Sequence, residues 1–347
     1  MNEPYQIPKR KRIPYGMMNF VDVRERDCYF VDKTSFIPAL EASNMFFFFI
    51  RPRRFGKSLT LTMLQHYYDV LDRDNFEKWY GGLYIGQHPT PERNSYLVIS
   101  LDFAEVLADI NNYSSSLDAY CNTEFRSFCR RYAEYLPDGM MEELCQKEGA
   151  VEQLSFLHKR CGEAGLQIYL FIDEYDHFTN KILAEPDCLN DYRSETHGTG
   201  YLRSFFDAVK AGTKTAIKRV FVTGVSPVTM DDLTSGFNIG TNYSLSPEFN
   251  ELVGFTEADV RAMLDYYATT CEFHHTTDQL IEIMKPWYDN YCFAKQSYGR
   301  TTMYNSNMVL YFVDNYIRNG GEVPDNMLEE NIRVDYNKLR MLIRKDK

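Results

Sequence analysis

An apolar run that leads directly into Gly-Lys-Ser constrains the fold of this chain more than any other feature of the sequence. Residues 45–50, Met-Phe-Phe-Phe-Phe-Ile, are too few to cross a membrane and have the composition of a buried strand. A short loop with Gly-Lys-Ser at 56–58 follows, and apolar residues then recur at helical spacing from Leu59 to Tyr67. Strand, Gly-Lys-Ser loop and helix in this order are the layout of a phosphate-binding P-loop. We therefore expect an α/β fold with a mostly parallel sheet that is covered by helices.

The chemistry expected of this loop follows from the backbone at the start of a helix. Its N–H groups converge on one point, and the helix dipole favours an anion there. Gly56 lets the backbone come close to the anion, Lys57 is expected to reach the β- and γ-phosphates, and Ser58 is expected to ligate Mg²⁺. Arg53 or Arg54 either adds a phosphate contact or holds the loop. The loop residues expected to bind the cofactor are Arg53, Arg54, Phe55, Gly56, Lys57, Ser58 and Leu59.

The match to the usual P-loop pattern, G-x-x-x-x-G-K-[ST], is incomplete. Arg51 stands where the first glycine belongs. A lone Gly-Lys-Ser also has a second interpretation, in which Ser58 caps the amino end of the helix and satisfies backbone donors. A separate acidic motif at the end of another strand is needed to favour the phosphate interpretation.

Such an acidic motif follows the apolar run at 167–172. The run is continuous, as in a parallel strand that is covered on both faces, and it leads into Asp173 and Glu174 in a Walker B arrangement. We expect Asp173 to hold Mg²⁺ through its water shell and Glu174 to orient and deprotonate the attacking water. Two adjacent carboxylates repel each other unless a cation is near, and a Mg²⁺–nucleotide supplies one. The alternative is a solvated acidic turn, which the upstream loop disfavours.

Two further strands are expected at 96–101 and 219–224. The first ends at Asp102, which either faces a ligand at the carboxyl edge of the sheet or caps the segment that follows. The second ends near Thr223, and in P-loop ATPases the strand beside Walker B often presents a polar residue that senses the γ-phosphate. Thr223 and Ser226 are the candidates, and simple turn formation after the strand is the alternative.

Length and pattern bound the domain organisation. The 347 residues divide into an amino-terminal arm at 1–43, a P-loop core at 44–253 and a smaller helical, lid-like subdomain at 254–347. The last part opens with a capping box at 256–259, and no strand is expected in it.

Charge, hydropathy and cysteine usage exclude several classes of protein. The net charge of −11 argues against a protein whose whole surface binds nucleic acid. No apolar run approaches the roughly 20 residues of a membrane span. The 8 cysteines form no C-x-x-C pair and no signal peptide is recognised, so we expect reduced thiols and a cytoplasmic location.

With these motifs in place, the chain resembles the bacterial AAA-ATPase-like family, and the resemblance runs almost end to end. The matching segments are IPYG at 13–16, YFVDKTSFI at 29–37, RPRRFGKSLTLTML at 51–64, LFIDEYD at 170–176, FVTGVSPV at 221–228, VGFTEADV at 253–260, WYDNYCF at 287–293 and YNSNMVL at 304–310. RPRRFGKS and IDEYD are the specific ones. The family usually has Arg at position 51, so the resemblance removes that objection to nucleotide binding. One departure is Asn290, where the family tends to have Gly in WYDGY.

The resemblance implies a P-loop ATPase fold related to archaeal and STAND ATPases, with ATP and Mg²⁺ as cofactors. The segment Asp32-Lys33-Thr34 recurs in the family, which implies a position near the nucleotide. Members often carry a PD-(D/E)xK nuclease-like domain beyond the helical region, and this chain stops about where that domain would begin. Nuclease activity is therefore not predicted for these residues. Nucleic acid is an open alternative as a partner through such a domain, and the basic tail at 9–12 leaves a weak contact with nucleic acid as a second alternative to a solvated arm.

Two functions from different classes remain open. The first is a Mg²⁺-dependent ATPase, in which Lys57 and Mg²⁺ stabilise charge on the phosphates while Glu174 activates a water. The second is a nucleotide-operated switch with little turnover, which controls a partner protein, a second copy of the chain or a nuclease-like domain. A kinase for a small acceptor shares the P-loop, but Glu174 suits water better than a specific acceptor. No membrane partner is expected.

Overall fold

The computed structural model describes residues 10–106, 113–177, 200–226 and 239–329. The chain divides into two compact units. Unit 1 comprises residues 1–33, 54–59 and 246–347, and unit 2 comprises residues 34–53 and 60–245. The two units have other boundaries than the three parts expected from the sequence, and that three-part division stays a prediction.

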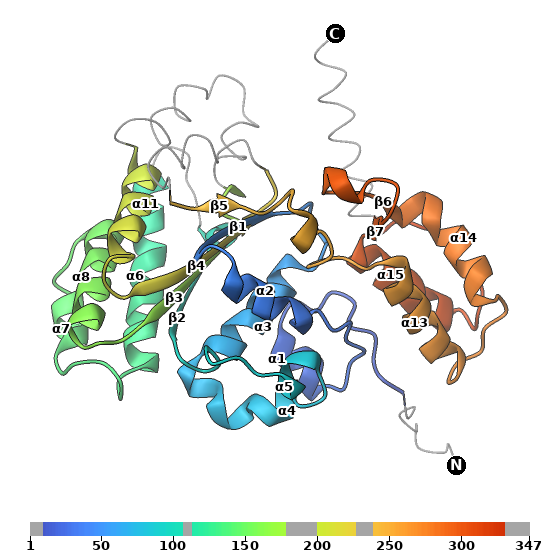
Figure 1. The fold of residues 1–347 in the computed structure, drawn as a ribbon, viewed down its shortest axis with the longest axis horizontal. Helices are drawn as coiled ribbons and strands as arrows, with labels where there is room; N and C mark the ends of the chain where they lie inside the picture. Colours follow the sequence, from blue (N-terminus) through green and yellow to red (C-terminus); the bar gives the residue numbers. More distant parts are fainter. Residues whose placement is uncertain (1–9, 107–112, 178–199, 227–238, 330–347) are drawn as a thin grey trace, which may run out of the picture. The chain divides into compact units, whose positions relative to one another are not determined.

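Unit 2 contains a five-stranded parallel sheet (Figure 1). Its strands are β1 (Phe46–Ile50), β2 (Leu97–Asp102), β3 (Ile168–Asp173), β4 (Ile217–Gly224) and β5 (Thr241–Asn242), in the order β2-β3-β4-β1-β5. Every pairing between neighbouring strands is parallel. The four strands expected from the sequence are present, and the predicted α/β class with a mostly parallel sheet is confirmed. β3 is buried along its whole length, which explains its unbroken apolar sequence.

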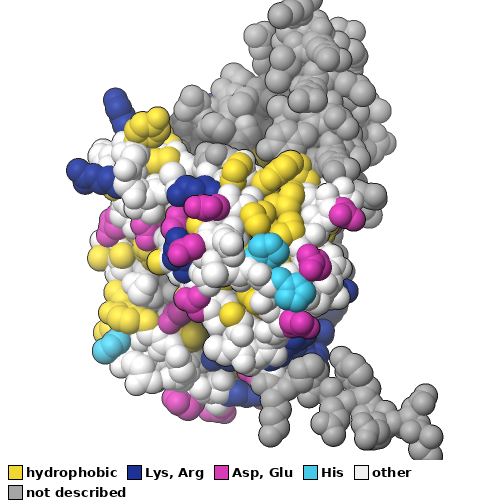
Figure 2. Space-filling view, turned by 90° about the vertical axis from the view of Figure 1, so that its right-hand side faces the viewer, with side chains coloured by type: hydrophobic (Ala, Val, Ile, Leu, Met, Phe, Trp, Pro, Cys, Tyr) yellow, Lys and Arg dark blue, Asp and Glu magenta, His cyan; other side chains and the backbone are white. Residues whose placement is uncertain are grey.

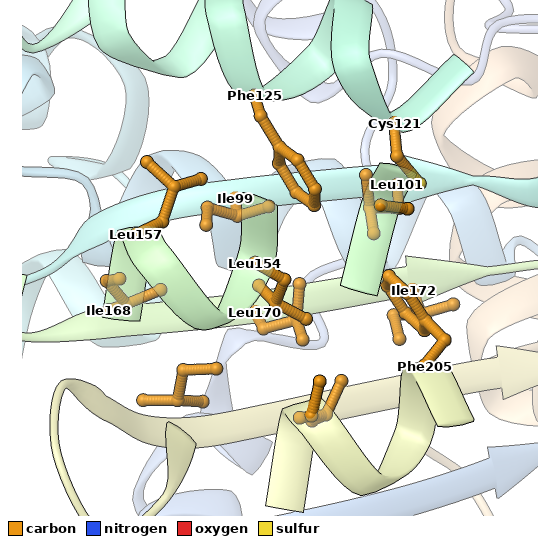
Figure 3. Packing of buried hydrophobic residues seen from close by; sticks show 14 of the residues in the cluster. Ile99, Leu101, Cys121, Phe125, Leu154, Leu157, Ile168, Leu170, Ile172 and Phe205 are labelled. Carbon is orange, nitrogen blue, oxygen red and sulfur yellow. The ribbon is translucent and has the colours of Figure 1, made fainter. Parts of the chain in front are cut away.

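Three long helices cover one face of this sheet. They are α6 (Tyr113–Arg131), α8 (Gly149–Glu163) and α11 (Tyr201–Gly212). Side chains alternate between the two faces of a strand, so Ile168, Leu170 and Ile172 of β3 all point toward these helices. Figure 3 shows them packed with Phe125 of α6 and Phe205 of α11. This cluster is the main hydrophobic core of unit 2, and each fully buried side chain of this size contributes about 1.5–3 kcal/mol.

The opposite face of the sheet carries α3 (Lys57–Tyr68), whose residues from Thr60 onward belong to unit 2. The rings of Tyr68 and Tyr169 lie 4.9 Å apart between centroids, and the Gln65 side-chain amide donates to the Ser100 hydroxyl at 2.8 Å. The helix that follows the Gly-Lys-Ser loop therefore packs on the sheet, as the P-loop layout requires.

Short helices complete unit 2. They are η1 (Thr34–Phe36), α2 (Ile37–Ala42), η2 (Val70–Asn75), α4 (Phe76–Tyr80), α5 (Tyr84–Gln87), η3 (Phe103–Glu105) and α7 (Met140–Leu144). Near the amino end of β4, Arg219 Nε donates to Glu92 Oε2 at 2.6 Å. Arg219 is buried, so this pair fixes the loop around Glu92 against the sheet.

Unit 1 has a separate hydrophobic core, to which three helices contribute most of the side chains. The elements of unit 1 are α1 (Phe20–Glu25), η5 (Pro247–Phe249), α13 (Glu257–Ala268), α14 (Thr277–Tyr288), β6 (Asp289–Tyr291), η6 (Lys295–Ser297), β7 (Met303–Tyr304) and α15 (Ser306–Arg318). The predicted capping box is confirmed. Thr256 Oγ1 accepts from the Asp259 N–H at 3.1 Å, and Asp259 Oδ2 accepts from the Thr256 N–H at 2.8 Å.

The expectation of no strand after residue 254 is wrong. β6 and β7 pair antiparallel, with Asp289 opposite Tyr304 and Tyr291 opposite Met303. Strands of two or three residues carry no alternating pattern that is long enough to recognise in a sequence. Their pairing also joins segments that only the folded chain brings together.

The described residues can be compared with the features of a membrane-spanning protein, and their side chains are seen on one face of the molecule in Figure 2. None of their helices is long and apolar enough to cross a membrane. Figure 2 shows one face of the molecule, on which hydrophobic side chains gather in a patch bordered by histidine and acidic side chains. Lys and Arg side chains on the described part of this face are scattered among acidic ones.

Candidate functional site

The carboxyl ends of β1, β3 and β4 lie at one edge of the sheet, because the three strands are parallel neighbours. Ile50 is the register partner of Gly224, and Ile172 is the partner of Val222. The chain leaves β1 at Arg51 on this edge, and its N–H donates to the Gly224 carbonyl at 3.2 Å. Open α/β sheets bind their ligands at this edge.

Asp173 and Thr223 point to the face of the sheet that carries α3. Asp173 is four residues beyond Tyr169, whose ring contacts α3, and residues two or four apart share one face of a strand. Thr223 is two residues beyond Phe221, which is the register partner of Phe171 on the same face. Two of the residues predicted from separate motifs are thus neighbours in unit 2.

The predicted phosphate loop, residues 51–58, leads from β1 into α3. It belongs to unit 2 as far as Arg53 and to unit 1 from Arg54 onward. Arg54 and Gly56 have positive φ angles of +71° and +89°. Left-handed residues that alternate with other conformations direct successive N–H groups to one side, which is an anion-binding arrangement. Gly56 takes this conformation without strain, and α3 begins directly after it at the buried Lys57.

Arg51, at the position of the missing glycine, is a buried structural side chain. Its Nη1 donates to the carbonyls of Ser244 at 2.6 Å and Ile50 at 2.9 Å, and its guanidinium lies 4.1 Å from the centroid of the Phe49 ring. Burial lowers the pKa of Arg51 to about 9. The Ile50 N–H also donates to Ser244 Oγ at 2.8 Å. Arg51 therefore ties the segment after β5 to the end of β1, a function that glycine could not perform.

Replacement of Arg51 by glycine restores the usual P-loop pattern, and we expect it to destabilise the protein. The Ser244 carbonyl would lose a charged donor inside the protein, which costs about 1–3 kcal/mol of unfolding free energy. Urea unfolding followed by circular dichroism measures this loss. We expect titration of the variant with ATP to give an affinity no higher than that of the wild-type protein. Unchanged stability together with tighter ATP binding would contradict the structural assignment of Arg51.

Asp173 and Glu174 occupy the turn at the end of β3. Asp173 is buried, and its Oδ1 accepts from the Glu174 N–H at 2.9 Å. Glu174 is half-buried and has a left-handed backbone with φ of +47°. Non-glycine residues in this conformation are uncommon, and they cluster at functional sites where the surroundings hold them. Asp173 is therefore withdrawn from solvent at the end of β3, and Glu174 is partly withdrawn from it.

Asp176 and Tyr175 form a network that the sequence analysis missed. The buried Asp176 carboxylate accepts from the N–H groups of Val225 at 3.0 Å and Ser226 at 2.5 Å, and the Tyr175 hydroxyl donates to the Ser226 carbonyl at 2.6 Å. A Cβ at Gly224 would collide with Asp176 Oδ1 and the Tyr175 ring, so glycine is required there. The turn after β3 thus fixes the turn after β4. The signal in the sequence was the complete motif, IDEYD.

Thr223 and Asp102 differ in whether their side-chain oxygens have a hydrogen-bond partner among the described residues. Thr223 is buried, and its Oγ1 has no hydrogen-bond partner among the described residues. A buried hydroxyl in this state is costly unless a ligand or water pairs with it. Asp102 Oδ1 accepts from the Ala104 N–H at 2.9 Å, so the capping interpretation of Asp102 is confirmed. Burial raises the pKa of Asp102.

The remaining predicted loop residues differ in exposure. Arg53 is exposed, whereas the Arg54 guanidinium lies 3.6 Å from the Glu329 carboxylate in unit 1. Ser58 and Leu59 are the second and third residues of α3 and are half-buried. Phe55 is buried, so its backbone is the part available to a cofactor.

The segments implied by family resemblance are partly described. Lys33 Nζ pairs with Asp259 Oδ2 at 2.7 Å in unit 1, and Thr34 Oγ1 accepts from the Ile85 N–H at 3.1 Å in unit 2. A position of 32–34 near a nucleotide stays a prediction. The side chain of Asn290 lies outside the described residues.

Comparisons with known proteins extend this description. The family model AAA-ATPase_like, described as predicted AAA-ATPase, matches residues 14–234. A protein of Azotobacter chroococcum mcd 1, described as an uncharacterized protein in the vnfD 5′ region, is 26% identical over 259 residues, 73% of this chain and 45% of that protein. The crystal structure of Cdc6p from Pyrobaculum aerophilum aligns with a TM-score of 0.37 and 13% identity, over 92% of this chain and 65% of that one. The chain thus spans less than half the length of the curated relative.

Proposed function

Because the chain belongs to the AAA-ATPase-like family of predicted AAA-ATPases, we propose that it binds ATP with Mg²⁺ and hydrolyses it. The observation that carries this proposal is the common edge of β1, β3 and β4. β1 continues into Gly-Lys-Ser from this edge, and β3 ends there in Asp173 and Glu174. A phosphate loop and a carboxylate pair that follow parallel strands on one edge are the two parts that ATP hydrolysis requires.

The residues of the phosphate loop bind and orient the triphosphate in this proposal. The N–H groups of the first turn of α3 receive the phosphates, and Lys57 donates to the β- and γ-phosphates. Ser58 and Asp173 offer a hydroxyl and a carboxylate, which are the hard oxygen donors that Mg²⁺ prefers. Mg²⁺, when bound, neutralises negative charge on the phosphate oxygens.

Glu174 is the general base of the proposed reaction. Its carboxylate orients a water and accepts its proton as the water oxygen bonds to the γ-phosphorus. The bond from that phosphorus to the bridging oxygen breaks, and ADP leaves. Asp173 Oδ1 accepts a hydrogen bond from the Glu174 N–H and so helps to fix the turn that contains the general base. The buried Thr223 hydroxyl, which has no partner among the described residues, is the proposed donor to the γ-phosphate.

Calorimetric titration with ATP and Mg²⁺ tests the binding part of the proposal. We expect one saturable site in the wild-type protein, together with release of inorganic phosphate. Absence of binding heat, confirmed by equilibrium dialysis with labelled ATP, would overturn the proposed function.

The second candidate function is the nucleotide-operated switch. It is favoured by the division of the phosphate loop between units, since Arg54–Leu59 belong with the carboxyl-terminal helices in unit 1. Because these loop residues are part of unit 1, phosphates that bind to them would shift the populations of the conformations of unit 1.

Limited proteolysis without nucleotide, with ADP and with ATP distinguishes the switch from a simple hydrolase. We expect a switch to give different cleavage patterns with ATP and with ADP, because the two nucleotides would favour different conformations. The Glu174→Gln variant serves as the matched sample, since it keeps ATP intact during digestion. Identical patterns with both nucleotides would exclude the switch.

A further inference from the structure

The middle of the phosphate loop is held by residues of unit 1 that lie far away in the sequence. The Phe55 ring packs edge to face against Tyr291 and Phe293, with centroids 4.8 Å and 5.3 Å away and interplanar angles of 82° and 80°. The Phe55 carbonyl accepts from the Gly254 N–H at 2.9 Å. A Cβ at Gly254 would lie 2.8 Å from the Phe55 ring, so this close approach requires glycine.

The carbonyl of Arg54 is held from the start of α15. It accepts from Ser306 Oγ at 3.2 Å and from the Asn307 N–H at 3.2 Å. Arg54 has a left-handed φ of +71°, which is unfavourable for a side chain larger than glycine unless the surroundings enforce it. The two hydrogen bonds to its carbonyl supply such enforcement.

The groups that hold the loop are themselves fixed. The buried Asn250 accepts with Oδ1 from the N–H groups of Phe293 at 3.3 Å and Ala294 at 3.1 Å. Asn305 caps α15 by accepting from the Met308 N–H at 3.3 Å. Phe293 and the start of α15, which both contact the loop, are therefore each held by a further hydrogen-bonding residue of unit 1.

We propose that Tyr291, Phe293 and Ser306 are positioning residues for nucleotide binding, which hold Phe55 and Arg54 so that the loop keeps its phosphate-receiving shape. None of the three touches a phosphate in this scheme. They act through the loop backbone, whose conformation decides where the N–H groups point. The inference rests on the proposed function, because it concerns the affinity of the same site.

The affinity of the loop for phosphates and the stability of the residues that support it are linked. If the support raises the affinity of the loop for phosphates, bound phosphates must stabilise the support by the same factor. Nucleotide binding is therefore expected to slow amide hydrogen exchange at residues 291–294, although these residues bind no nucleotide atom.

The experiment compares Phe293→Leu with Phe273→Leu. Phe273 also packs edge to face on an aromatic ring of unit 1, that of Tyr316 at 4.9 Å, but among the described residues it makes no ring contact or hydrogen bond with residues 54–59. Loss of the aromatic pair between Phe293 and Phe55 corresponds to a change of about 2- to 10-fold. We expect Phe293→Leu to speed exchange at residues 52–58 of the nucleotide-free protein, and to weaken ATP binding, by factors in this range. Phe273→Leu is expected to change neither.

A second pair of variants tests the hydroxyl contact. Ser306→Ala removes the donor to the Arg54 carbonyl and is expected to weaken ATP binding by a similar factor, whereas Ser306→Thr keeps the hydroxyl and restores it. Equal effects of Phe293→Leu and Phe273→Leu on both exchange and affinity would overturn the inference. If the wild-type protein bound no ATP, the proposed function would fall separately. Exchange in the nucleotide-free variants would still decide whether these residues hold the loop.

Discussion

Glu174→Gln is expected to lower the rate of phosphate release from ATP by about 10²- to 10⁴-fold, the usual contribution of a general base. Glutamine keeps the size of the side chain and can still hydrogen-bond a water, but it cannot accept the proton. Binding of ATP should be retained, because the affinity comes from the phosphate loop. A coupled phosphate assay at saturating ATP measures the rate, and calorimetry measures the affinity.

Glu105→Gln is the matched control for this substitution. Glu105 ends η3, directly after β2 on the same carboxyl edge, and it is exposed. The variant removes the same charge from the same edge without touching the turn at 173–176, so its rate should equal that of the wild-type protein. Equal rates for Glu174→Gln and wild type, both well above the uncatalysed background, would remove Glu174 from the mechanism. A wild-type rate at the uncatalysed background would instead leave the switch as the function.

The strands could be predicted because their signal is local. The phenylalanine run of β1 and the run before Asp173 are apolar at every position, as strands covered on both faces require. The capping box at Thr256 is equally local, since its two hydrogen bonds join residues three apart. β6 and β7 could not be predicted, because their few residues acquire strand geometry only by pairing across a loop.

The candidate site could be predicted as a set of residue types but not as a set of contacts. The sequence identifies Asp173 as an acid at a strand end, yet the hydrogen bonds of Asp176 to the turn after β4 join residues about fifty positions apart. Arg51 looks like a lost glycine in the pattern, and its partner Ser244 cannot be inferred from spacing. α3 begins at Lys57, so Ser58 is the second residue of the helix and not the residue that precedes it, as the capping interpretation of Ser58 requires.

Lys57→Ala is expected to weaken binding of ATP by about 10- to 150-fold, which corresponds to the loss of hydrogen bonds from a charged donor, about 1.5–3 kcal/mol. The loss should be larger for ATP than for ADP, because the ammonium group is expected to reach both the β- and the γ-phosphate. Calorimetric titration of the variant with each nucleotide in the presence of Mg²⁺ measures the two losses. A melting curve of the variant shows whether the fold is kept.

The control for Lys57 is Lys218→Ala, which removes a half-buried lysine from strand β4. Lys218 is the second residue of β4 and lies six positions before Gly224 at the carboxyl edge, about 20 Å along a strand. At that distance its charge is largely screened from the edge at physiological salt. Affinity should therefore stay at the wild-type value in Lys218→Ala and fall in Lys57→Ala. If both variants bound ATP as the wild type does, Gly-Lys-Ser would be no more than the capped start of a helix.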